Sequence, residues 1–139
     1  MIFVDTNVLM YAAGGEHPLQ RPCRVVVDAI GSRSLEATTS VEVVQEIVHR
    51  YLAIGRAQGG LELADETLDL FAPVLPITHA LMRRVPALAR RYPRLSARDV
   101  IHLATCIHEG ITEIISTDRG FDAVSEVRRI PPEELFATR

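Results

Sequence analysis

Two acidic side chains follow the two most convincing strand segments of this 139-residue chain. Asp5 comes directly after the apolar residues 1–4, and Asp118 follows the segment 113–116 with a single residue between them. An ionised carboxyl group after an apolar strand has few structural uses, although it can form an Asx turn. If both strands are parallel, their carboxyl ends meet at one edge of the sheet, so we expect Asp5 and Asp118 to lie along that edge.

Further carboxylates lie near the start of predicted helices. Glu42 and Glu46 are one helical turn apart, so both side chains project from the same helix face. Asp99 occupies the first turn of another helix, and Asp122 lies four residues beyond Asp118. Each of these acids also has an ordinary interpretation as a helix N-terminal acid, a turn residue or a solvated helix residue. Taken together, they predict a cluster of oxygen-rich side chains on one rim of the fold.

Several carboxylates cannot share a small site in ionised form unless a cation neutralises them, because like charges raise one another's pKa. Mg²⁺ and Mn²⁺ meet this requirement, since both prefer carboxylate and water oxygens as ligands. Such an ion can activate a bound water and stabilise the charge on a phosphodiester. The carboxylate pattern therefore predicts metal-assisted hydrolysis of a phosphodiester.

The predicted elements alternate between short strands and helices, which is typical of a parallel sheet covered by helices on both faces. We predict strands over 1–4, 35–38, 74–77, 113–116 and 127–130, and helices over 8–12, 18–30, 41–52, 61–71, 78–91 and 97–109, with a kink at Pro86 in the helix over 78–91. The fold class is therefore a three-layer α/β/α sandwich with a short, mainly parallel sheet of four or five strands, in a single domain over residues 1–139.

Local signals set several helix boundaries. Thr39 and Glu42 have the spacing of a capping box, and Ser96 is the predicted N-cap of the last long helix. Gly59 and Gly60 are expected to separate two helices, because glycine is unfavourable inside a helix.

Apolar residues make up 47% of the chain and there is no Trp, so aliphatic side chains must supply most of the core. Cys23 and Cys106 are far apart and form no CxxC motif, which argues against a disulfide framework and against a thiolate zinc site. No apolar run approaches the length of about 20 residues that crosses a bilayer, and the chain does not open on a basic segment. We therefore expect a soluble, cytoplasmic protein with both thiols buried and reduced.

The net charge is −3 and all 15 basic residues are arginines, so an anionic partner such as nucleic acid must meet a local positive patch. Such a patch is offered by six arginines shortly before or next to Asp99: Arg83, Arg84, Arg90, Arg91, Arg94 and Arg98. Contacts from these side chains to phosphates would position RNA without specifying its sequence. The ordinary alternative is a solvated helix face.

Four segments of the chain resemble the sequence pattern of the PIN-domain family, and in particular the VapC-like toxins of type II toxin–antitoxin systems. The segments are 4–9 (VDTNVL), the region around Glu46, 97–104 (ARDVIHLA) and 116–122 (STDRGFD). The first segment alone has little specificity, but the four segments in this order and at this spacing are quite specific. Together they cover nearly the whole chain. The resemblance implies a PIN-like fold and a Mg²⁺- or Mn²⁺-dependent endoribonuclease, the toxin of a toxin–antitoxin pair.

Carried over position by position, the resemblance also implies site roles. The acids that hold the metal and position an attacking water would be Asp5, Glu46, Asp99 and Asp118, with Asp5, Asp99 and Asp118 as metal ligands. Glu46 is preferred to Glu42 because residues 43–46 match the apolar segment that leads into the family's second acid. The supporting residues would be Asn7, Ser116, Asp122 and Glu42. The resemblance further implies a homodimer, and a cognate antitoxin whose tail enters the acidic groove.

Other functions fit the sequence less well. Glu46 with His49, and Asp99 with His102, have the spacing of di-iron ligands, but that site requires four long helices and leaves the predicted strands without a place. A receiver domain and a dehalogenase-type phosphatase both need a lysine, which this chain lacks, and there is no P-loop motif. We expect His102 to be a packed or supporting residue. The remaining alternative is a non-catalytic PIN-like module that binds RNA or a protein, and an Asp5→Asn substitution would distinguish it from an enzyme.

Overall fold

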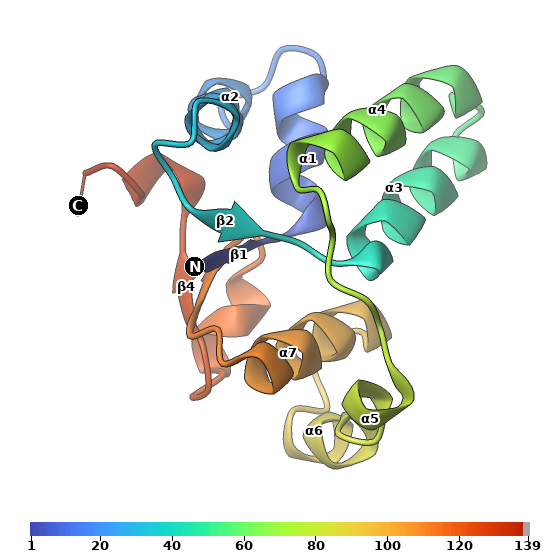
Figure 1. The fold of residues 1–139 in the computed structure, drawn as a ribbon, viewed down its shortest axis with the longest axis vertical. Helices are drawn as coiled ribbons and strands as arrows, with labels where there is room; N and C mark the ends of the chain where they lie inside the picture. Colours follow the sequence, from blue (N-terminus) through green and yellow to red (C-terminus); the bar gives the residue numbers. More distant parts are fainter. Residues whose placement is uncertain (138–139) are drawn as a thin grey trace.

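A computed structural model describes residues 1–137 and contains a parallel sheet of four short strands (Figure 1). The strands lie in the order β2 (Ala37–Thr38), β1 (Ile2–Val4), β3 (Glu113–Ile115) and β4 (Arg128–Ile130). In the central pair, Phe3 of β1 is in register with Ile114 of β3. Both residues are fully buried, as expected for central strands that are covered on both faces. The α/β class and the parallel sheet are therefore confirmed.

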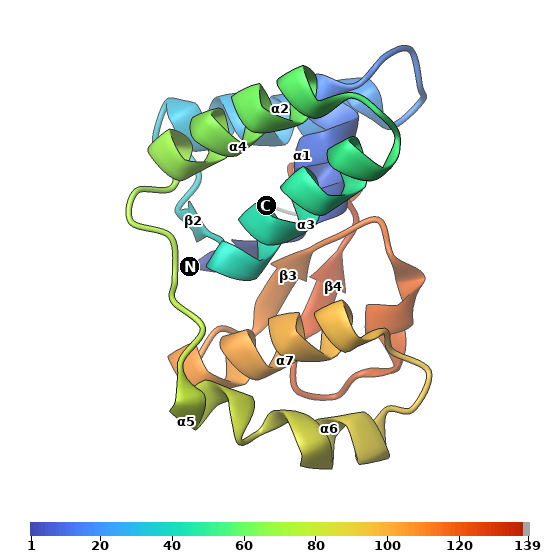
Figure 2. The same ribbon diagram turned by 90° about the vertical axis from the view of Figure 1, so that its right-hand side faces the viewer.

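Helices lie on both sides of this sheet, which gives the molecule three layers (Figure 2). One group gathers on the side shown at the top of Figure 2: α1 (Thr6–Ala13), α2 (Gln20–Gly31), α3 (Val41–Ala53) and α4 (Ala57–Leu70). The other side carries α7, against which two short helices pack: α7 (Ala97–Glu109), α5 (His79–Met82) and α6 (Val85–Arg91). Two 3₁₀ helices follow the last two strands: η1 (Arg119–Ala123) and η2 (Pro132–Glu134).

Three helices begin near the carboxyl ends of the strands. Helices α1 and α3 begin directly after β1 and β2, and Figure 1 shows that α7 begins on the same side of the molecule. Side chains in the first turns of these helices therefore face the edge of the sheet where ligands bind in parallel α/β folds.

Helix α7 has the predicted boundaries because both of its ends are capped. The hydroxyl of Ser96 accepts a hydrogen bond from the Asp99 N–H at 3.2 Å, as expected for an N-cap. At the other end, Gly110 adopts a φ of 70°, a left-handed conformation that glycine reaches without strain. Val100 and Leu103 form part of the buried face that packs into the core. Together these contacts hold the helix, and with it Asp99, in a fixed position.

The start of α3 differs from the prediction. Thr39 does not cap the helix, because α3 begins at Val41 and the N-cap is therefore Ser40. The Thr39 hydroxyl instead donates to the carbonyl of Val4 at 2.9 Å and so joins β1 to the loop before α3. The hydroxyl of Ser40 forms no hydrogen bond within residues 1–137. The predicted capping box is wrong because the helix begins one residue later than that pattern requires, which leaves Glu42 at the second helical position instead of the third.

Helix α4 begins earlier than predicted, and Gly59 and Gly60 lie inside it rather than between two helices. A Cβ atom added to Gly60 would lie only 2.3 Å from the Cβ of Tyr51. Glycine therefore lets α4 approach α3 closely at this point, and the contact between the helices outweighs the low helix propensity of glycine.

The segment between α4 and α7 also corrects two predictions. Residues 74–77 form no strand, and Leu75 makes an isolated bridge to Ser40. Prolines at 73 and 76 flank Leu75, and a proline has no N–H for a strand ladder. The helix predicted over 78–91 is in fact α5 and α6, because Pro86 occupies the first turn of α6, where a missing N–H costs least.

Both cysteines are free and buried, as predicted. Burial raises the pKa of the Cys23 thiol to about 11 and that of the Cys106 thiol to about 12. Both thiols therefore stay protonated at neutral pH and behave as small apolar side chains.

No helix within residues 1–137 combines the length and the apolar character that spanning a membrane requires. The longest of them, α4, has 14 residues and exposes several acidic side chains.

Candidate metal centre

Asp5 is a buried carboxylate at the point where β1 meets α1, and it is only 3% exposed. One oxygen, Oδ1, accepts a hydrogen bond from the Thr6 N–H at 2.7 Å. The other oxygen, Oδ2, accepts hydrogen bonds from the Ser116 hydroxyl at 2.6 Å and from the Asn7 amide at 3.1 Å. These donors fix the orientation of the carboxylate, so Asp5 presents its remaining lone pairs in a defined direction.

Ser116 links the loops that follow β1 and β3. Besides donating to Asp5, its hydroxyl accepts hydrogen bonds from the Asp118 N–H at 2.9 Å and from the Asn7 amide at 3.3 Å. The carbonyl oxygen of the Asn7 side chain in turn accepts from the Thr117 N–H at 3.1 Å. The structure therefore brings Asn7 and Ser116 into direct contact with Asp5 and places Asp118 on the same edge of the sheet.

Glu46 projects from α3 into the same region and is 9% exposed. Its Oε1 accepts a hydrogen bond from the Thr6 hydroxyl at 2.8 Å. Its Oε2 lies 3.7 Å from Nε of Arg98 and 3.8 Å from Nε of Arg50. Burial alone would raise the pKa of Glu46, but the neighbouring His102 imidazole, the Thr6 hydroxyl and the Arg98 charge leave that pKa below its usual value. Glu46 is therefore ionised at neutral pH.

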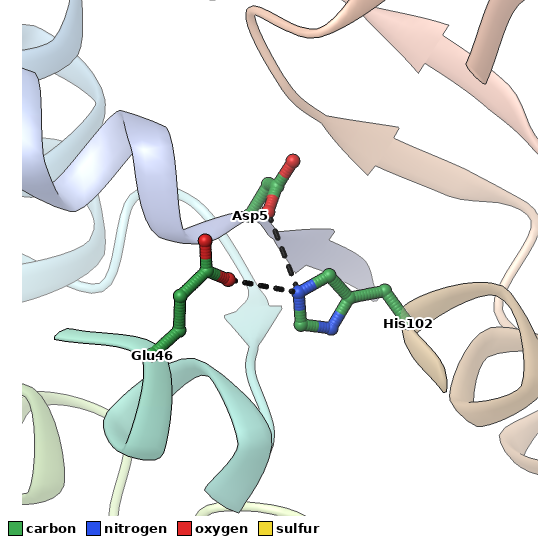
Figure 3. Close-up of side chains that lie close together, drawn as sticks. All are labelled: Asp5, Glu46 and His102. Carbon is green, nitrogen blue, oxygen red and sulfur yellow. Dashed lines mark ion pairs between the residues drawn. The ribbon is translucent and has the colours of Figure 1, made fainter. Parts of the chain in front are cut away.

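His102 of α7 faces both of these acids, as Figure 3 shows. Its Nε2 lies 3.5 Å from Asp5 Oδ1 and 3.7 Å from Glu46 Oε1, and the side chain is completely buried. Burial alone would lower the pKa of His102, but the carboxylates of Glu46 and Asp5 outweigh it and leave that pKa raised. The ring also stacks at a tilt on Phe3, with 5.3 Å between the ring centroids, which holds it toward the end of β1.

Asp99 lies beside these groups, in the first turn of α7. Burial, together with the nearby carboxyl groups of Asp5 and Asp118, raises the pKa of Asp99 to about 7. The group is therefore partly protonated at neutral pH, which is the expected behaviour of a carboxyl group crowded by like charges. Asp5, Asp99 and Asp118 thus form one electrostatic cluster.

Asp118 and Asp122 occupy the loop after β3 and have different surroundings. Oδ1 of Asp118 accepts a hydrogen bond from the Gly120 N–H at 2.8 Å, which caps η1. Both oxygens of Asp122 accept from Arg129, at 2.8 and 3.2 Å, and this pairing holds the pKa of Asp122 below its usual value. Arg129 also donates to the carbonyl of Ser116 at 2.9 Å. Asp122 therefore contacts the site indirectly, through Arg129 and the backbone of Ser116.

The structure distinguishes the two candidate glutamates. Glu42 is half-buried in the first turn of α3 and forms no hydrogen bond or ion pair within residues 1–137. Glu46, one turn later, is the residue that reaches Thr6 and His102. Of the two candidate glutamates, Glu46 is therefore the one that lies in the cluster with Asp5.

The six predicted arginines have different surroundings. Arg98 lies beside Glu46, and Arg91 forms an ion pair with Glu126 at 3.0 Å. Arg94 is exposed in the loop before α7. The other members are exposed in the segment that contains α5 and α6: Arg83, Arg84 and Arg90.

The donor set of this site fits a divalent cation. One ligand atom each from Asp5, Glu46 and His102 lies within 4.8 Å of the others. Neither nitrogen of His102 has a hydrogen-bond partner within residues 1–137, although a buried polar atom is normally paired. The carboxylates suit Mg²⁺ and Mn²⁺, and the imidazole extends the set to other divalent transition metals. An ion at this point would also relieve the crowding that raises the pKa of Asp99.

Sequence reasoning missed the contribution of Thr6 and Arg50 to this site, and it gave His102 only a packed or supporting role and not that of a possible metal ligand. Two spacings were available as signals, because residues three or four apart share a helix face. Arg50 follows Glu46 by four residues, and His102 follows Asp99 by three. Nothing in the sequence indicated that the Thr6 hydroxyl would bind Glu46, because that contact joins residues 40 positions apart.

Comparisons with known proteins agree with this fold. A family model for the PIN domain matches residues 2–127. The chain is 36% identical over 130 residues to a protein named VapC ribonuclease Mb1869c from Mycobacterium bovis, covering 94% of this chain and 99% of that protein. It is 37% identical over 118 residues to Ribonuclease VapC23 from Mycobacterium tuberculosis, covering 85% of this chain and 93% of that protein.

Two solved structures show the same arrangement at lower identity. The structure titled FitAcB from Neisseria gonorrhoeae superposes with a TM-score of 0.72 at 20% identity, covering 97% of this chain and 100% of that one. VapBC2 from Rickettsia felis, bound to a DNA fragment from its promoter, gives a TM-score of 0.73 at 13% identity, covering 94% and 98%. At these identities the similarity establishes the fold, a parallel sheet flanked by helices.

Proposed function

The chain belongs to the PIN-domain family, and from that premise we propose that it is a metal-dependent endoribonuclease that acts as the toxin of a toxin–antitoxin pair. The observation that carries the proposal is the convergence of Asp5, Glu46 and Asp99 near the carboxyl ends of β1 and β3, with Asp118 beside them. The names of the mycobacterial relatives support ribonuclease activity.

Asp5, Asp99 and Asp118 would hold Mg²⁺ or Mn²⁺, which is supported by the effect of the Asp5 and Asp118 carboxyl groups on the pKa of Asp99. Glu46 and His102 each offer a further ligand atom within 4.8 Å of one on Asp5. When bound, a divalent cation supplies the positive charge that activates water and offsets the charge of a phosphodiester. The residues around it have separate tasks. Ser116 and Asn7 keep the Asp5 carboxylate in one orientation, and Glu46, ionised at neutral pH, can accept a proton from a water and orient it.

The test is cleavage of labelled total RNA by the purified protein with Mg²⁺, with Mn²⁺ and with EDTA. We expect cleavage with at least one of the two ions, loss of cleavage in EDTA and recovery when the ion is returned in excess. The Asp5→Asn variant, purified in the same way, controls for contaminating ribonucleases. RNA binding by the wild type, without any cleavage that this variant loses, would instead support the non-catalytic binding module.

We predict that the affinity for Mn²⁺ rises by about tenfold from pH 6 to pH 8, with about fivefold of that rise below pH 7, and then levels off. The reason is that the cation must displace the proton held by Asp99, whose pKa is raised to about 7. Isothermal titration calorimetry in two buffers of different ionisation enthalpy would measure both the affinity and the protons released. The Asp99→Asn variant should bind more weakly, with a flatter pH dependence. An equally steep pH dependence in that variant would assign the displaced proton to another group.

We also propose an antitoxin partner and a homodimer. Support for the partner comes from a structural neighbour, whose title describes a toxin-antitoxin complex from Klebsiella pneumoniae. Exposed apolar side chains at the end of α3 and the start of α4 offer surface for association: Leu52, Ile54 and Leu61. Size-exclusion chromatography with light scattering would measure the oligomeric state, and a monomer at micromolar concentration would argue against the dimer.

A further inference from the structure

A pocket of about 390 Å³ lies beside the acidic cluster. Two segments form its walls. One is the end of α6 together with the loop before α7, and the other is η1. The lining residues that matter here are Arg91, Tyr92, Arg94, Leu95, Arg119 and Gly120. Its volume falls within the range of small-molecule sites in proteins.

The pocket touches both of the loops that carry acids. Leu95 lies just before Ser96, the N-cap of the helix that holds Asp99. Gly120 donates its N–H to Asp118, and a Cβ atom at position 120 would lie 3.1 Å from Asp118 Oδ1 and 3.4 Å from Leu95 Cδ2. The wall formed by Gly120 therefore separates the pocket from Asp118 by the width of one residue. A polymer that is bound across the acidic cluster can therefore continue directly into the pocket.

The charge of the pocket is positive. Arg91 is neutralised by Glu126, but neither Arg94 nor Arg119 has an ion pair within 4 Å in the part of the chain described, residues 1–137. Both side chains are exposed at the pocket rim. Although the charge of Arg119 also acts on the nearby Asp122 carboxylate, both guanidinium groups lack a direct carboxylate partner, so they favour an anionic occupant over a basic one.

The pocket also has an ordered aromatic wall. The hydroxyl of Tyr92 donates to Glu126 and accepts a hydrogen bond from the Ser125 N–H at 3.3 Å. The guanidinium of Arg91 lies 5.3 Å from the centre of the Tyr92 ring, so one partner already holds the ring by a cation–π contact. The remaining wall is apolar, from Leu95 and its neighbours. An aromatic side chain beside unpaired arginines is the combination that binds unstacked bases and phosphates of single-stranded nucleic acid.

We propose that this pocket binds one nucleotide of the RNA substrate next to the phosphodiester that is cleaved. The base packs against Tyr92 and Leu95, and Arg94 and Arg119 contact the adjoining phosphates. The pocket is then a determinant of which RNA is cut, because a shaped, partly apolar wall accepts some bases better than others. This inference rests on the proposed ribonuclease activity. An antitoxin peptide is the other conceivable occupant, and the unpaired arginines disfavour it if its tail is basic.

The test compares two double variants with equal loss of charge. Arg94→Gln with Arg119→Gln changes the pocket, and Arg21→Gln with Arg56→Gln removes two exposed arginines from α2 and from the residue before α4. Affinity for a fluorescent single-stranded RNA of mixed sequence is measured by anisotropy in EDTA, with Asp5→Asn present to prevent cleavage. We expect the pocket variant to bind about tenfold more weakly and to lose about 1.4 from the slope of log K against log salt, which corresponds to two phosphate contacts.

A second pair of variants tests the aromatic wall without changing charge. Tyr92→Leu should weaken RNA binding by about tenfold while the salt slope stays the same, because base stacking carries no counterion release. Tyr92→Phe removes only the hydroxyl contacts and should retain most of the affinity. Thermal unfolding of each variant shows whether it is folded at the assay temperature. The same substitutions made in the protein that retains Asp5, assayed with metal, show from the nucleotides at the fragment ends whether the cutting preference has moved.

The outcomes separate the two proposals. If the wild type cleaves RNA but the pocket variants match the Arg21→Gln with Arg56→Gln control in affinity, salt slope and fragment ends, the pocket inference is wrong and the ribonuclease proposal stands. If the pocket variants lose affinity only for an antitoxin, the occupant is a peptide and the inference is also wrong. If the wild type neither binds nor cleaves RNA, the proposed function itself fails.

Discussion

Replacing Asp5 with asparagine is expected to slow RNA cleavage by about 100-fold or more, the loss typical when one preorganised charged group is removed from an active site. Asp5 lies at the centre of the cluster, in contact with Ser116 and Asn7 and close to His102. Asparagine keeps the shape and one acceptor oxygen but removes the negative charge that attracts a cation. Steady-state cleavage of a defined RNA would measure the loss.

A matched control is available on the opposite side of the sheet from α7. Asp65 is exposed on α4, so Asp65→Asn removes the same charge from the protein without touching the site. We expect wild-type cleavage from this control. The Asp5 variant should still unfold cooperatively and bind RNA, since its losses in hydrogen bonding amount to about 1 kcal/mol. Cleavage within a few-fold of the wild type would contradict the assignment of Asp5.

The Asp99→Asn variant is expected to lose cleavage to a similar extent and, in metal-free buffer at pH 8, to be more stable than the wild type by about 1–2 kcal/mol. The pKa of Asp99 in the folded protein is raised to about 7, well above the usual aspartate value of 3.8. Folding therefore favours the protonated carboxyl group, and ionisation in the folded state is costly. This cost is absent below pH 4, grows as the pH rises toward 7 and is complete above it. Asparagine has no charge and avoids it.

Urea unfolding in EDTA at pH 4, 6 and 8 would measure this effect. The wild type should lose stability relative to the variant as the pH rises, and the two should converge at pH 4. Adding Mn²⁺ at pH 8 should stabilise the wild type far more than the variant, because binding to the folded state shifts the unfolding equilibrium. A constant difference at all three pH values would mean that the ionisation of Asp99 does not cause it.

The sequence predicted the parts of this site that follow from local pattern. Asp5 and Asp118 were placed on one edge because each follows a strand of a parallel sheet. Asp99 was placed in a first helical turn by the Ser96 cap, and the structure has that cap. The choice between Glu42 and Glu46 could not be made from helical spacing, since residues one turn apart share a face. Which of the two glutamates reaches the site depends on how α3 packs against α1.

The failures share a physical cause, which is that a contact between distant segments outweighed a local preference. Gly60 lies inside α4 because Tyr51 of α3 needs the space that a side chain would fill. Thr39 lies one residue before the N-cap of α3, where its hydroxyl donates to the carbonyl of Val4. The approach of His102 to both Asp5 and Glu46, beyond the supporting role expected of it, likewise depends on three elements meeting. Such contacts have no signature in a window of neighbouring residues.

Arg129 gives the site an order of assembly during synthesis. Its guanidinium holds the carbonyl of Ser116, and the next residue, Ile130, accepts a hydrogen bond from the Ser116 N–H at 3.3 Å. The loop that carries Asp118 is thus anchored by β4, which is synthesised after every acid of the site. We expect a chain that ends at residue 127 to lack cleavage activity, and activity in such a chain would disprove this order. The acids of the site would therefore become aligned only after residues 128–130 have been synthesised.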